Sequence, residues 1–181
     1  MAEEQKKRQL KQHIFLIGFM GTGKSTVSRK LRDLLQVREI DMDQMIVSEA
    51  GMSIPAMFEK FGESCFREKE TQMLRILSAR TPALISCGGG TVLRPENVAI
   101  MKSCGQIVLL TAEPETVFQR VRYGKNRPVL NGHMNVAYIA QLMEQRRAAY
   151  ESACDVRVST DDKTPAAIAQ EILELIRKKG V

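Results

Sequence analysis

The sequence contains no tryptophan, and aromatic residues make up only 5% of its 181 residues. Its histidines are His13 and His133, and its four cysteines show no C-x-x-C spacing, so we expect no structural zinc site. Reduced thiols of this kind are typical of a cytoplasmic protein. No apolar run approaches the length of a membrane span, and the N-terminus lacks the apolar segment of a signal peptide. We therefore expect a cytoplasmic protein that does not enter a membrane.

The formal net charge of +6 does not indicate nucleic-acid binding, because the basic residues are spread along the chain and few aromatic residues accompany them. A basic pocket for anionic small molecules explains the excess equally well. The length fits one domain with a sizeable core. We interpret residues 1–12 as a polar extension and residues 13–181 as a single domain, and we expect a monomer.

The segment Gly18–Thr26 reads G-F-M-G-T-G-K-S-T, which contains the phosphate-binding pattern G-x-x-x-x-G-K-S. An apolar run precedes it and a helical pattern follows it, as this motif requires. The backbone N–H groups and the start of the helix would hold phosphate oxygens. Lys24 would reach the β- and γ-phosphates, and the Ser25 hydroxyl would hold Mg²⁺. The residues predicted to bind ATP in this segment are Gly21, Thr22, Gly23, Lys24, Ser25 and Thr26.

Five apolar runs predict strands that alternate with helical patterns, and this alternation is typical of an α/β fold with a parallel sheet. The expected strands lie at residues 14–18, 38–40, 83–87, 106–111 and 155–159. Asp41 and Asp43 follow the second strand, and Gly88, Gly89 and Gly90 follow the third. In open α/β sheets, ligands bind at these carboxyl ends of the strands.

Two connections are longer or more irregular than a crossover requires. Residues 42–79 are mostly helical, with interruptions expected near Gly51 and Gly62, and we interpret this segment as a substrate-binding subdomain. Residues 121–134 show little periodicity and carry Arg127, and Arg120 lies just before them. This segment predicts a mobile lid that closes over a triphosphate, with a solvated connection as the alternative.

Arg146 lies in the middle of an apolar helical stripe. Each helical residue turns by about 100°, so Arg147 should face outward. An arginine in such a stripe requires an anionic partner, either a ligand or a carboxylate.

Taken together, these motifs in this order resemble the shikimate kinase family over nearly the whole chain from about Ile14. The motifs that carry the resemblance are the phosphate loop, Asp41-Met42-Asp43, Gly62-Glu63 with Phe66-Arg67 and Glu70, Gly88-Gly89-Gly90, Arg127-Pro128-Val129-Leu130, and Arg146 four residues before Tyr150. The resemblance implies a three-layer P-loop kinase fold, with a five-stranded parallel sheet between helices on both faces. It also implies transfer of the γ-phosphate of ATP to the 3-hydroxyl of shikimate, with Mg²⁺, in aromatic amino-acid biosynthesis.

The resemblance also implies roles for single residues. Asp43, Arg67, Gly89, Gly90 and Arg146 would surround shikimate, whose carboxylate calls for arginines and whose hydroxyls call for an acidic group. Asp43 would receive the hydroxyl proton or position the hydroxyl, and Lys24 and Arg127 would neutralise the transferring phosphoryl group. Asp41 would lie close to Mg²⁺, and Arg120 would stack on the adenine ring, near the segment Ser159-Thr160-Asp161. Glu70 would orient Arg67, although an exposed i,i+3 pair is an alternative.

Two other functions remain open from the residues. One is a different small-metabolite kinase of the same fold, such as a gluconate kinase or a nucleoside monophosphate kinase. The other is a nucleotide-binding regulator without transfer activity. A nucleotide acceptor would need a base pocket and further phosphate-binding arginines, and a regulator would be expected to lack Asp43 or Arg127.

Overall fold

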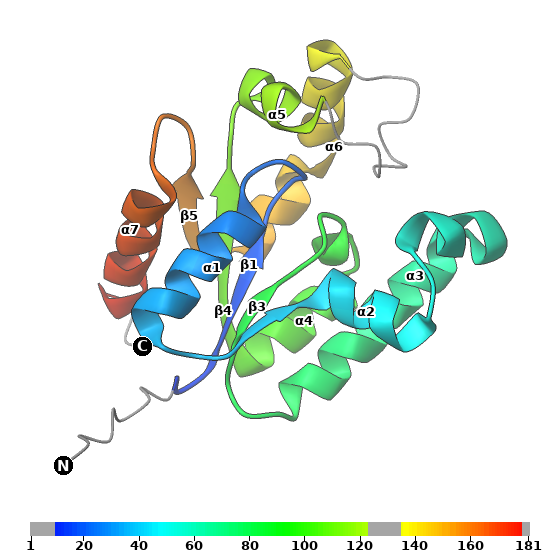
Figure 1. The fold of residues 1–181 in the computed structure, drawn as a ribbon, viewed down its shortest axis with the longest axis horizontal. Helices are drawn as coiled ribbons and strands as arrows, with labels where there is room; N and C mark the ends of the chain where they lie inside the picture. Colours follow the sequence, from blue (N-terminus) through cyan, green and yellow to red (C-terminus); the bar gives the residue numbers. More distant parts are fainter. Residues whose placement is uncertain (1–9, 123–134, 179–181) are drawn as a thin grey trace.

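The computed structural model describes residues 10–122 and 135–178. Its centre is an all-parallel sheet of five strands in the order β2-β3-β1-β4-β5 (Figure 1). The strands are β1 (His13–Ile17), β2 (Glu39–Asp41), β3 (Leu84–Ser86), β4 (Gly105–Thr111) and β5 (Val156–Ser159). The predicted α/β class and all five predicted strand positions are confirmed to within one or two residues. Only residues 10–12 of the polar extension are described. Arg127 lies outside the described residues, and so does the predicted lid apart from residues 121–122.

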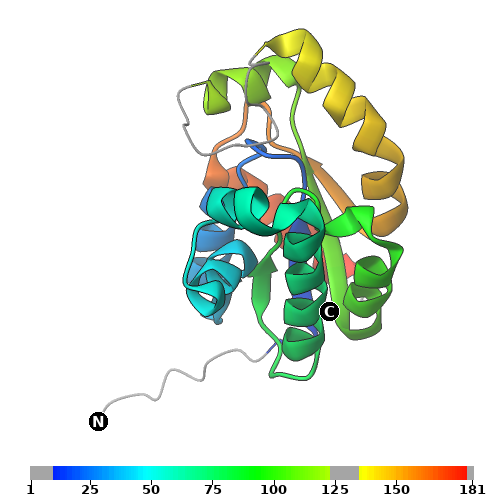
Figure 2. The ribbon, with the colours of Figure 1, turned by 90° about the vertical axis from the view of Figure 1, so that its right-hand side faces the viewer.

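Helices cover both faces of the sheet, so its strands are apolar on both sides (Figures 1 and 2). One face packs against α1 (Lys24–Leu35) and α7 (Pro165–Lys178), through residues such as Leu31 and Ile172. The other face packs against α3 (Ile54–Ser78), α4 (Pro95–Cys104), α5 (Pro114–Val121) and α6 (Val136–Ala153). Successive side chains of β1 alternate between these two cores, with Ile14 and Leu16 on the first and Phe15 and Ile17 on the second.

The segment predicted to bind substrate consists of α2 (Met42–Ala50) and α3, and both expected interruptions are present. Gly51 ends α2 with a left-handed backbone, and Ser53 caps α3 by accepting a hydrogen bond from the Ala56 N–H at 3.3 Å. Gly62 departs from helical geometry, with φ 79° and ψ 165°, and bends α3. This bend lets a single long segment both pack on the sheet and extend beyond its edge (Figure 1).

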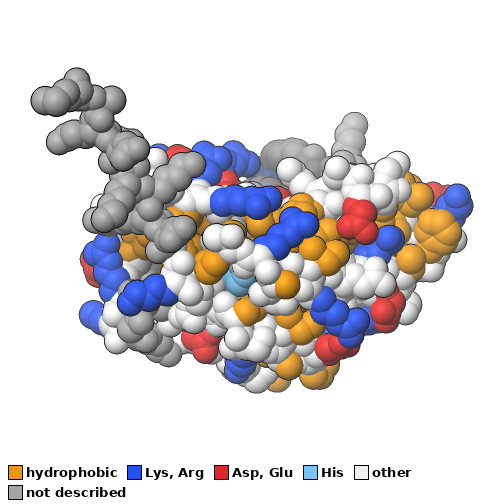
Figure 3. Space-filling model, turned by 90° about the horizontal axis from the view of Figure 1, so that it is seen from below, with side chains coloured by type: hydrophobic (Ala, Val, Ile, Leu, Met, Phe, Trp, Pro, Cys, Tyr) orange, Lys and Arg blue, Asp and Glu red, His pale blue; other side chains and the backbone are white. Residues whose placement is uncertain are grey.

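The strand order places β1 between β3 and β4. The helix that follows β1, α1, packs on one face of the sheet, whereas α4 and α5, which follow β3 and β4, pack on the other face. The loop after β1 therefore lies at the switch point, which is where open α/β sheets bind ligands. No helix in the described parts of the chain is long and apolar enough to cross a membrane. On the face seen in Figure 3, basic side chains alternate with acidic and apolar ones.

Candidate active site

The phosphate loop connects β1 to α1 and has the strained backbone that its glycines allow. Gly18 has φ 148°, and a Cβ there would lie 2.4 Å from the Leu110 carbonyl oxygen, so only glycine fits. Lys24 turns back into the loop, where its Nζ donates to the carbonyls of Gly18 at 2.7 Å and Phe19 at 3.0 Å. Gly21, Gly23, Ser25 and Thr26 complete the turn into α1, and Thr22 donates its hydroxyl to the Phe19 carbonyl at 2.8 Å. The predicted ATP-binding residues thus form one loop at the N-terminus of α1.

Asp43 lies in the first turn of α2, which Asp41 caps by accepting a hydrogen bond from the Gln44 N–H at 3.1 Å. One carboxylate oxygen of Asp43, Oδ1, is buried and has no hydrogen-bond partner among the described residues. Burial raises the pKa of Asp43 to about 6, and the charges of Glu70 and Asp41 add to this rise, while Lys24 and Arg67 oppose it. A carboxylate with an unused acceptor and a pKa near neutrality is able to accept a proton from a substrate hydroxyl.

Arg67 is held from two sides on α3. Its Nη1 lies 2.6 Å from Oε2 of Glu70, and its Nη2 lies 2.7 Å from Oε1 of Glu63. Glu63 is exposed, with 55% of its side chain accessible, whereas the Glu70 side chain is 0% accessible. The alternative of an exposed pair between Arg67 and Glu70 is therefore wrong. Sequence spacing identified this pair but could not show its burial, because burial depends on the later segment that covers it.

The glycines after β3 allow the side chains of Asp43, Arg67 and Glu70 to lie close to the backbone of this segment. A Cβ on Gly90 would lie 2.4 Å from the Arg67 guanidinium, and a Cβ on Gly88 would lie 2.7 Å from Asp43 Oδ1 and 2.8 Å from Glu70 Oε1. The backbone of this segment thus approaches three charged side chains at distances that no side chain of its own would permit. Gly89 lies on the other side of the segment, next to the phosphate loop.

Arg146 of α6 completes the group from the opposite side. Its Nη1 lies 3.5 Å from the Gly89 carbonyl oxygen, and its guanidinium lies 5.6 Å from the centroid of the Phe19 ring. Tyr150, one turn later, also donates its hydroxyl to the Gly89 carbonyl. No acidic side chain of the described chain forms an ion pair with Arg146, whereas exposed Arg147 pairs with Glu144. The predicted difference between these neighbouring arginines is confirmed.

Arg120 joins three segments beside the phosphate loop. Its Nη1 donates to Thr160 Oγ1 at 2.9 Å and to the Gly21 carbonyl at 3.2 Å, and its Nη2 donates to the Thr160 carbonyl at 3.1 Å. Arg120 and Thr160, which the resemblance places near the adenine ring, are therefore in contact. The described residues contain no cluster of three or more His, Cys, Asp or Glu side chains that would hold a metal by themselves.

The comparisons with known proteins agree with this geometry. A family model described as "Shikimate kinase" matches residues 20–177. The shikimate kinase of Enterococcus faecalis is 39% identical over 166 residues, covering 91% of this chain and 98% of that protein. The one from Persephonella marina is 40% identical over 165 residues, covering 91% and 99%.

This chain belongs to the shikimate kinase family. Its fold matches a shikimate kinase from Acinetobacter baumannii, solved in complex with shikimate, with a TM-score of 0.89 at 34% identity over 94% of this chain and 95% of that one. A gluconokinase from Sinorhizobium meliloti gives a TM-score of 0.62 at 17% identity over 95% of both chains, which shows a shared fold only. The enzymes of this family phosphorylate shikimate, so the comparisons favour shikimate kinase activity over both of the other functions that the residues left open.

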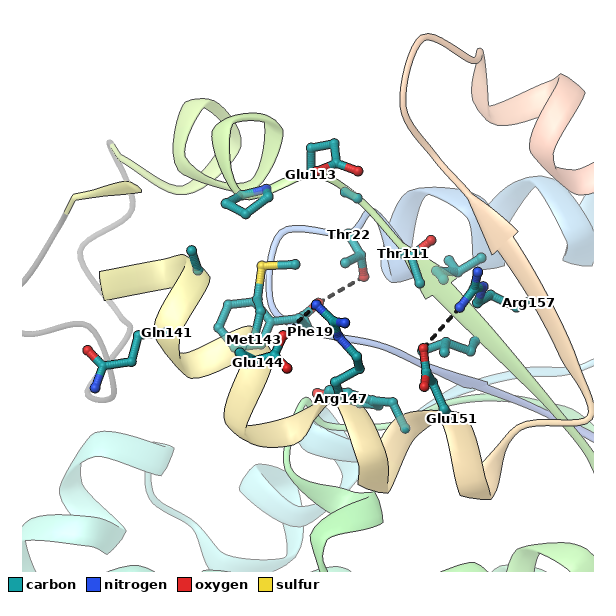
Figure 4. A pocket seen from close by; sticks show the side chains of 16 residues that line it. Phe19, Thr22, Thr111, Glu113, Gln141, Met143, Glu144, Arg147, Glu151 and Arg157 are labelled. Atoms are coloured by element: carbon teal, nitrogen blue, oxygen red, sulfur yellow. Dashed lines mark hydrogen bonds and ion pairs between the residues drawn. The ribbon is translucent and has the colours of Figure 1, made fainter. Parts of the chain in front are cut away.

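A separate cleft of about 820 Å³ lies between α6 and the ends of β4 and β5 (Figure 4). Among the predicted site residues that the structure describes, only Thr22 lines it. Its margin carries the pairs Glu144 with Arg147 and Glu151 with Arg157, the second at 3.0 Å. The cleft therefore adjoins the back of the phosphate loop and is distinct from the group formed by Asp43, Arg67 and Arg146.

Sequence reasoning missed two contributors to the site. Phe19 was treated only as a variable position of the phosphate loop, although its ring faces Arg146 and its carbonyl accepts from Lys24. Thr91 donates to Glu70 and was not singled out at all. Phe19 occupies a variable position of the phosphate-loop motif, and the signal for Thr91 is its place directly after the three glycines.

Proposed function

We propose that this protein transfers the γ-phosphoryl group of ATP to the 3-hydroxyl of shikimate and that Asp43 is the group that receives the hydroxyl proton. The observation that carries the proposal is the buried, unpartnered Oδ1 of Asp43 beside Arg67 and the glycine segment. A buried acceptor without a donor is unfavourable unless a ligand supplies one. A substrate hydroxyl supplies such a donor.

In the proposed reaction, the shikimate oxygen forms a bond to the γ-phosphorus while the bond from that phosphorus to the bridging oxygen of ADP breaks. The hydroxyl proton passes to Asp43 Oδ1 as the new bond forms. Lys24 lies on the loop that would hold the β- and γ-phosphates, and its charge would offset the negative charge of the transferring group. The raised pKa of Asp43 fits this role, because a base with a pKa near the working pH both accepts and releases a proton readily.

The carboxylate of shikimate would bind between Arg67 and Arg146. Arg146 is the stronger candidate for direct pairing, because no carboxylate of the described chain forms an ion pair with it. Arg67 already has two acidic partners, of which exposed Glu63 is the easier to displace. The carbonyl of Gly89 and the backbone of Gly90 would contact the ring from the side of the glycine segment.

The residues of the loop also fit a magnesium ion bound together with ATP. Mg²⁺ in such sites takes one or two protein oxygens, with phosphate oxygens and waters as its other ligands. Ser25 and Asp41 supply a hydroxyl and a carboxylate at the loop and at the end of β2, so a larger acidic cluster is not needed. The ion would supply charge neutralisation at the phosphates. On the nucleotide side, Arg120 would contact adenine, and Arg127 would reach the phosphates from a segment outside the described residues.

The experiment that tests the reaction is an acceptor panel. Purified protein is given ATP and Mg²⁺ with shikimate, gluconate, AMP or quinate, and ADP formation is measured with identification of the phosphorylated product. We expect rapid turnover with shikimate and much slower turnover with the other three acceptors. Similar rates with gluconate would favour a different small-metabolite kinase of the same fold. ATP binding without transfer to any acceptor would favour a nucleotide-binding regulator without transfer activity.

The residue assignments are tested with matched neighbours. Arg146→Ala should weaken shikimate binding by roughly 10- to 100-fold, the range for losing a hydrogen bond to a charged group, and should leave ATP binding nearly unchanged. Arg147→Ala is the control, because Arg147 is 63% exposed one position away. Equal effects of the two substitutions would show that Arg146 does not bind the carboxylate.

A further inference from the structure

Four polar side chains form a buried network directly behind the glycine segment. They belong to α3, the short 3-10 helix η1 (Thr91–Leu93) and α4, and none is more than 2% exposed: Glu70, Thr71, Thr91 and Asn97. A glutamate is almost never buried completely unless it is paired. Because each member is hydrogen-bonded, the network fixes its own geometry in a way that an apolar cluster would not.

Glu70 has a partner for each carboxylate oxygen. Oε2 lies 2.6 Å from Nη1 of Arg67, and Oε1 accepts a hydrogen bond of 2.5 Å from the hydroxyl of Thr91. The hydroxyl therefore holds the side of the carboxylate that Arg67 does not reach. With the Thr91 donor in place, the rotation of the Glu70 carboxylate is set, and with it the direction from which Arg67 is held.

Thr91 is itself anchored by its backbone. Its carbonyl accepts a hydrogen bond of 2.9 Å from Asn97 Nδ2, and Asn97 Oδ1 accepts one of 2.7 Å from Thr71 Oγ1. Its N–H donates to the Gly88 carbonyl at 3.3 Å. The same residue thus connects α3, α4 and the glycine segment at the point where Gly90 passes against Arg67.

We propose that Thr91 is a positioning residue for shikimate binding, which acts by holding Glu70 and thereby the guanidinium of Arg67. The inference rests on the proposed role of Arg67 in binding the substrate carboxylate. Thr91 itself would not touch substrate, ATP or the reacting atoms. Its hydroxyl is required as a donor to Glu70, so any residue of similar size with a hydroxyl should replace it.

The test compares Thr91→Val, which keeps the shape and removes the donor, with Thr91→Ser, which keeps the donor. We expect Thr91→Val to raise KM for shikimate by about three- to tenfold, the range for losing one buried hydrogen bond, with kcat and KM for ATP within about twofold of wild type. Thr91→Ser should restore KM for shikimate to within about twofold. Calorimetric titration with shikimate should give the same order of affinities.

Thr71→Val is the matched control, because Thr71 belongs to the same network and forms no hydrogen bond to Glu70; its hydroxyl lies 3.1 Å from the backbone carbonyl oxygen of Arg67 and does not contact the guanidinium. It should lower the thermal unfolding midpoint while leaving KM for shikimate within about twofold. A purely structural role for Thr91 predicts that both valine variants lower stability alike and leave KM for shikimate unchanged, and that result would overturn the proposal. An equal rise of KM for shikimate and for ATP in Thr91→Val would overturn it as well. If Thr91→Val does not fold, Thr91→Ala is measured against the same limits.

Arg67→Ala separates this inference from the function on which it rests. If Arg67→Ala weakens shikimate binding and Thr91→Val does not, only the role of Thr91 is wrong. If neither substitution weakens it, the assignment of Arg67 to the substrate is wrong too. In both cases the acceptor panel still reports independently whether shikimate is phosphorylated.

Discussion

Replacing Asp43 with asparagine should make the protein more stable while removing most of its turnover. The pKa of Asp43 rises from 3.8 to about 6 in the folded protein, because the carboxylate is buried near Glu70 and Asp41. A difference of about two between the folded and unfolded pKa corresponds to roughly 3 kcal/mol of folding free energy at neutral pH. Asparagine has nearly the same shape without the charge, so Asp43→Asn should recover up to about 3 kcal/mol.

The pH dependence of this gain follows from its sign. A carboxyl group whose folded pKa is raised binds its proton more tightly in the folded state, so the destabilisation develops as pH rises from 3.8 to about 6 and is complete above that. Below pH 3.8 the group is neutral in both states. The stability difference between Asp43→Asn and wild type should therefore be largest at pH 7 and should nearly vanish near pH 4.

Urea unfolding followed by circular dichroism at several pH values measures this difference. At pH 7, a gain of about 3 kcal/mol corresponds to a rise of roughly 6–12 °C in the midpoint of thermal unfolding for a protein of this size. Asp33→Asn is the control, because Asp33 is 57% exposed on α1 and its replacement should change stability by less than about 0.5 kcal/mol. An Asp43→Asn variant that is no more stable than wild type at pH 7, or whose gain does not depend on pH, would refute the reasoning.

Two further predictions concern the glycine segment and the start of β1. Gly90→Ala should raise KM for shikimate about tenfold or more, because the added Cβ would lie 2.4 Å from the Arg67 guanidinium and must displace it. Steady-state kinetics measures this effect. Gly51→Ala is the control for general backbone effects, since a Cβ at Gly51 meets no atom within 4 Å. Burial lowers the pKa of His13, whose Nδ1 accepts a hydrogen bond of 3.1 Å from the Ala83 N–H, so stability should fall as pH drops below about 6.5. In His13→Asn, which keeps an acceptor without titrating, that loss between pH 7 and pH 5 should be smaller, and an unchanged loss would contradict the assignment to His13.

The sequence patterns predicted the sheet and the phosphate loop because both depend on local information. A strand buried on both faces is a short continuous apolar run, and the spacing of Gly18, Gly23 and Lys24 is set by the loop geometry itself. The two interruptions of the substrate-binding segment were equally readable, since Gly51 and Gly62 adopt backbone angles that favour glycine.

The surroundings of Glu70 could not be predicted in the same way. Its spacing from Arg67 indicates only that the two share a face of a helix, and this pattern is common on exposed helices as well. What buries Glu70 is the contact of α3 with η1 and α4, which are 21 or more residues away along the chain. Phe19 is a similar case, because its partner Arg146 comes from a helix at the other end of the sequence. The resemblance to a family implied the roles of Arg67 and Arg146, but it did not predict the burial of Glu70 or the contact of Arg146 with Phe19.

These surroundings make the two arginines unequal, although both were assigned to the same carboxylate. Arg67 is fixed by Glu63 and by fully buried Glu70, so it is oriented before any ligand arrives, and a ligand carboxylate must compete with Glu63 for it. Among the described residues, Arg146 contacts the Gly89 carbonyl oxygen, the Phe19 ring and the Tyr150 side chain and forms no ion pair, so its charge is not offset by a neighbouring carboxylate there. If both arginines bind the substrate carboxylate as proposed, Arg67 would set the geometry of the site and Arg146 would supply most of the pairing energy. Because Arg146 also lies against Phe19, whose carbonyl accepts a hydrogen bond from Lys24, a carboxylate bound at Arg146 would be connected through these contacts to the loop that would hold the phosphates.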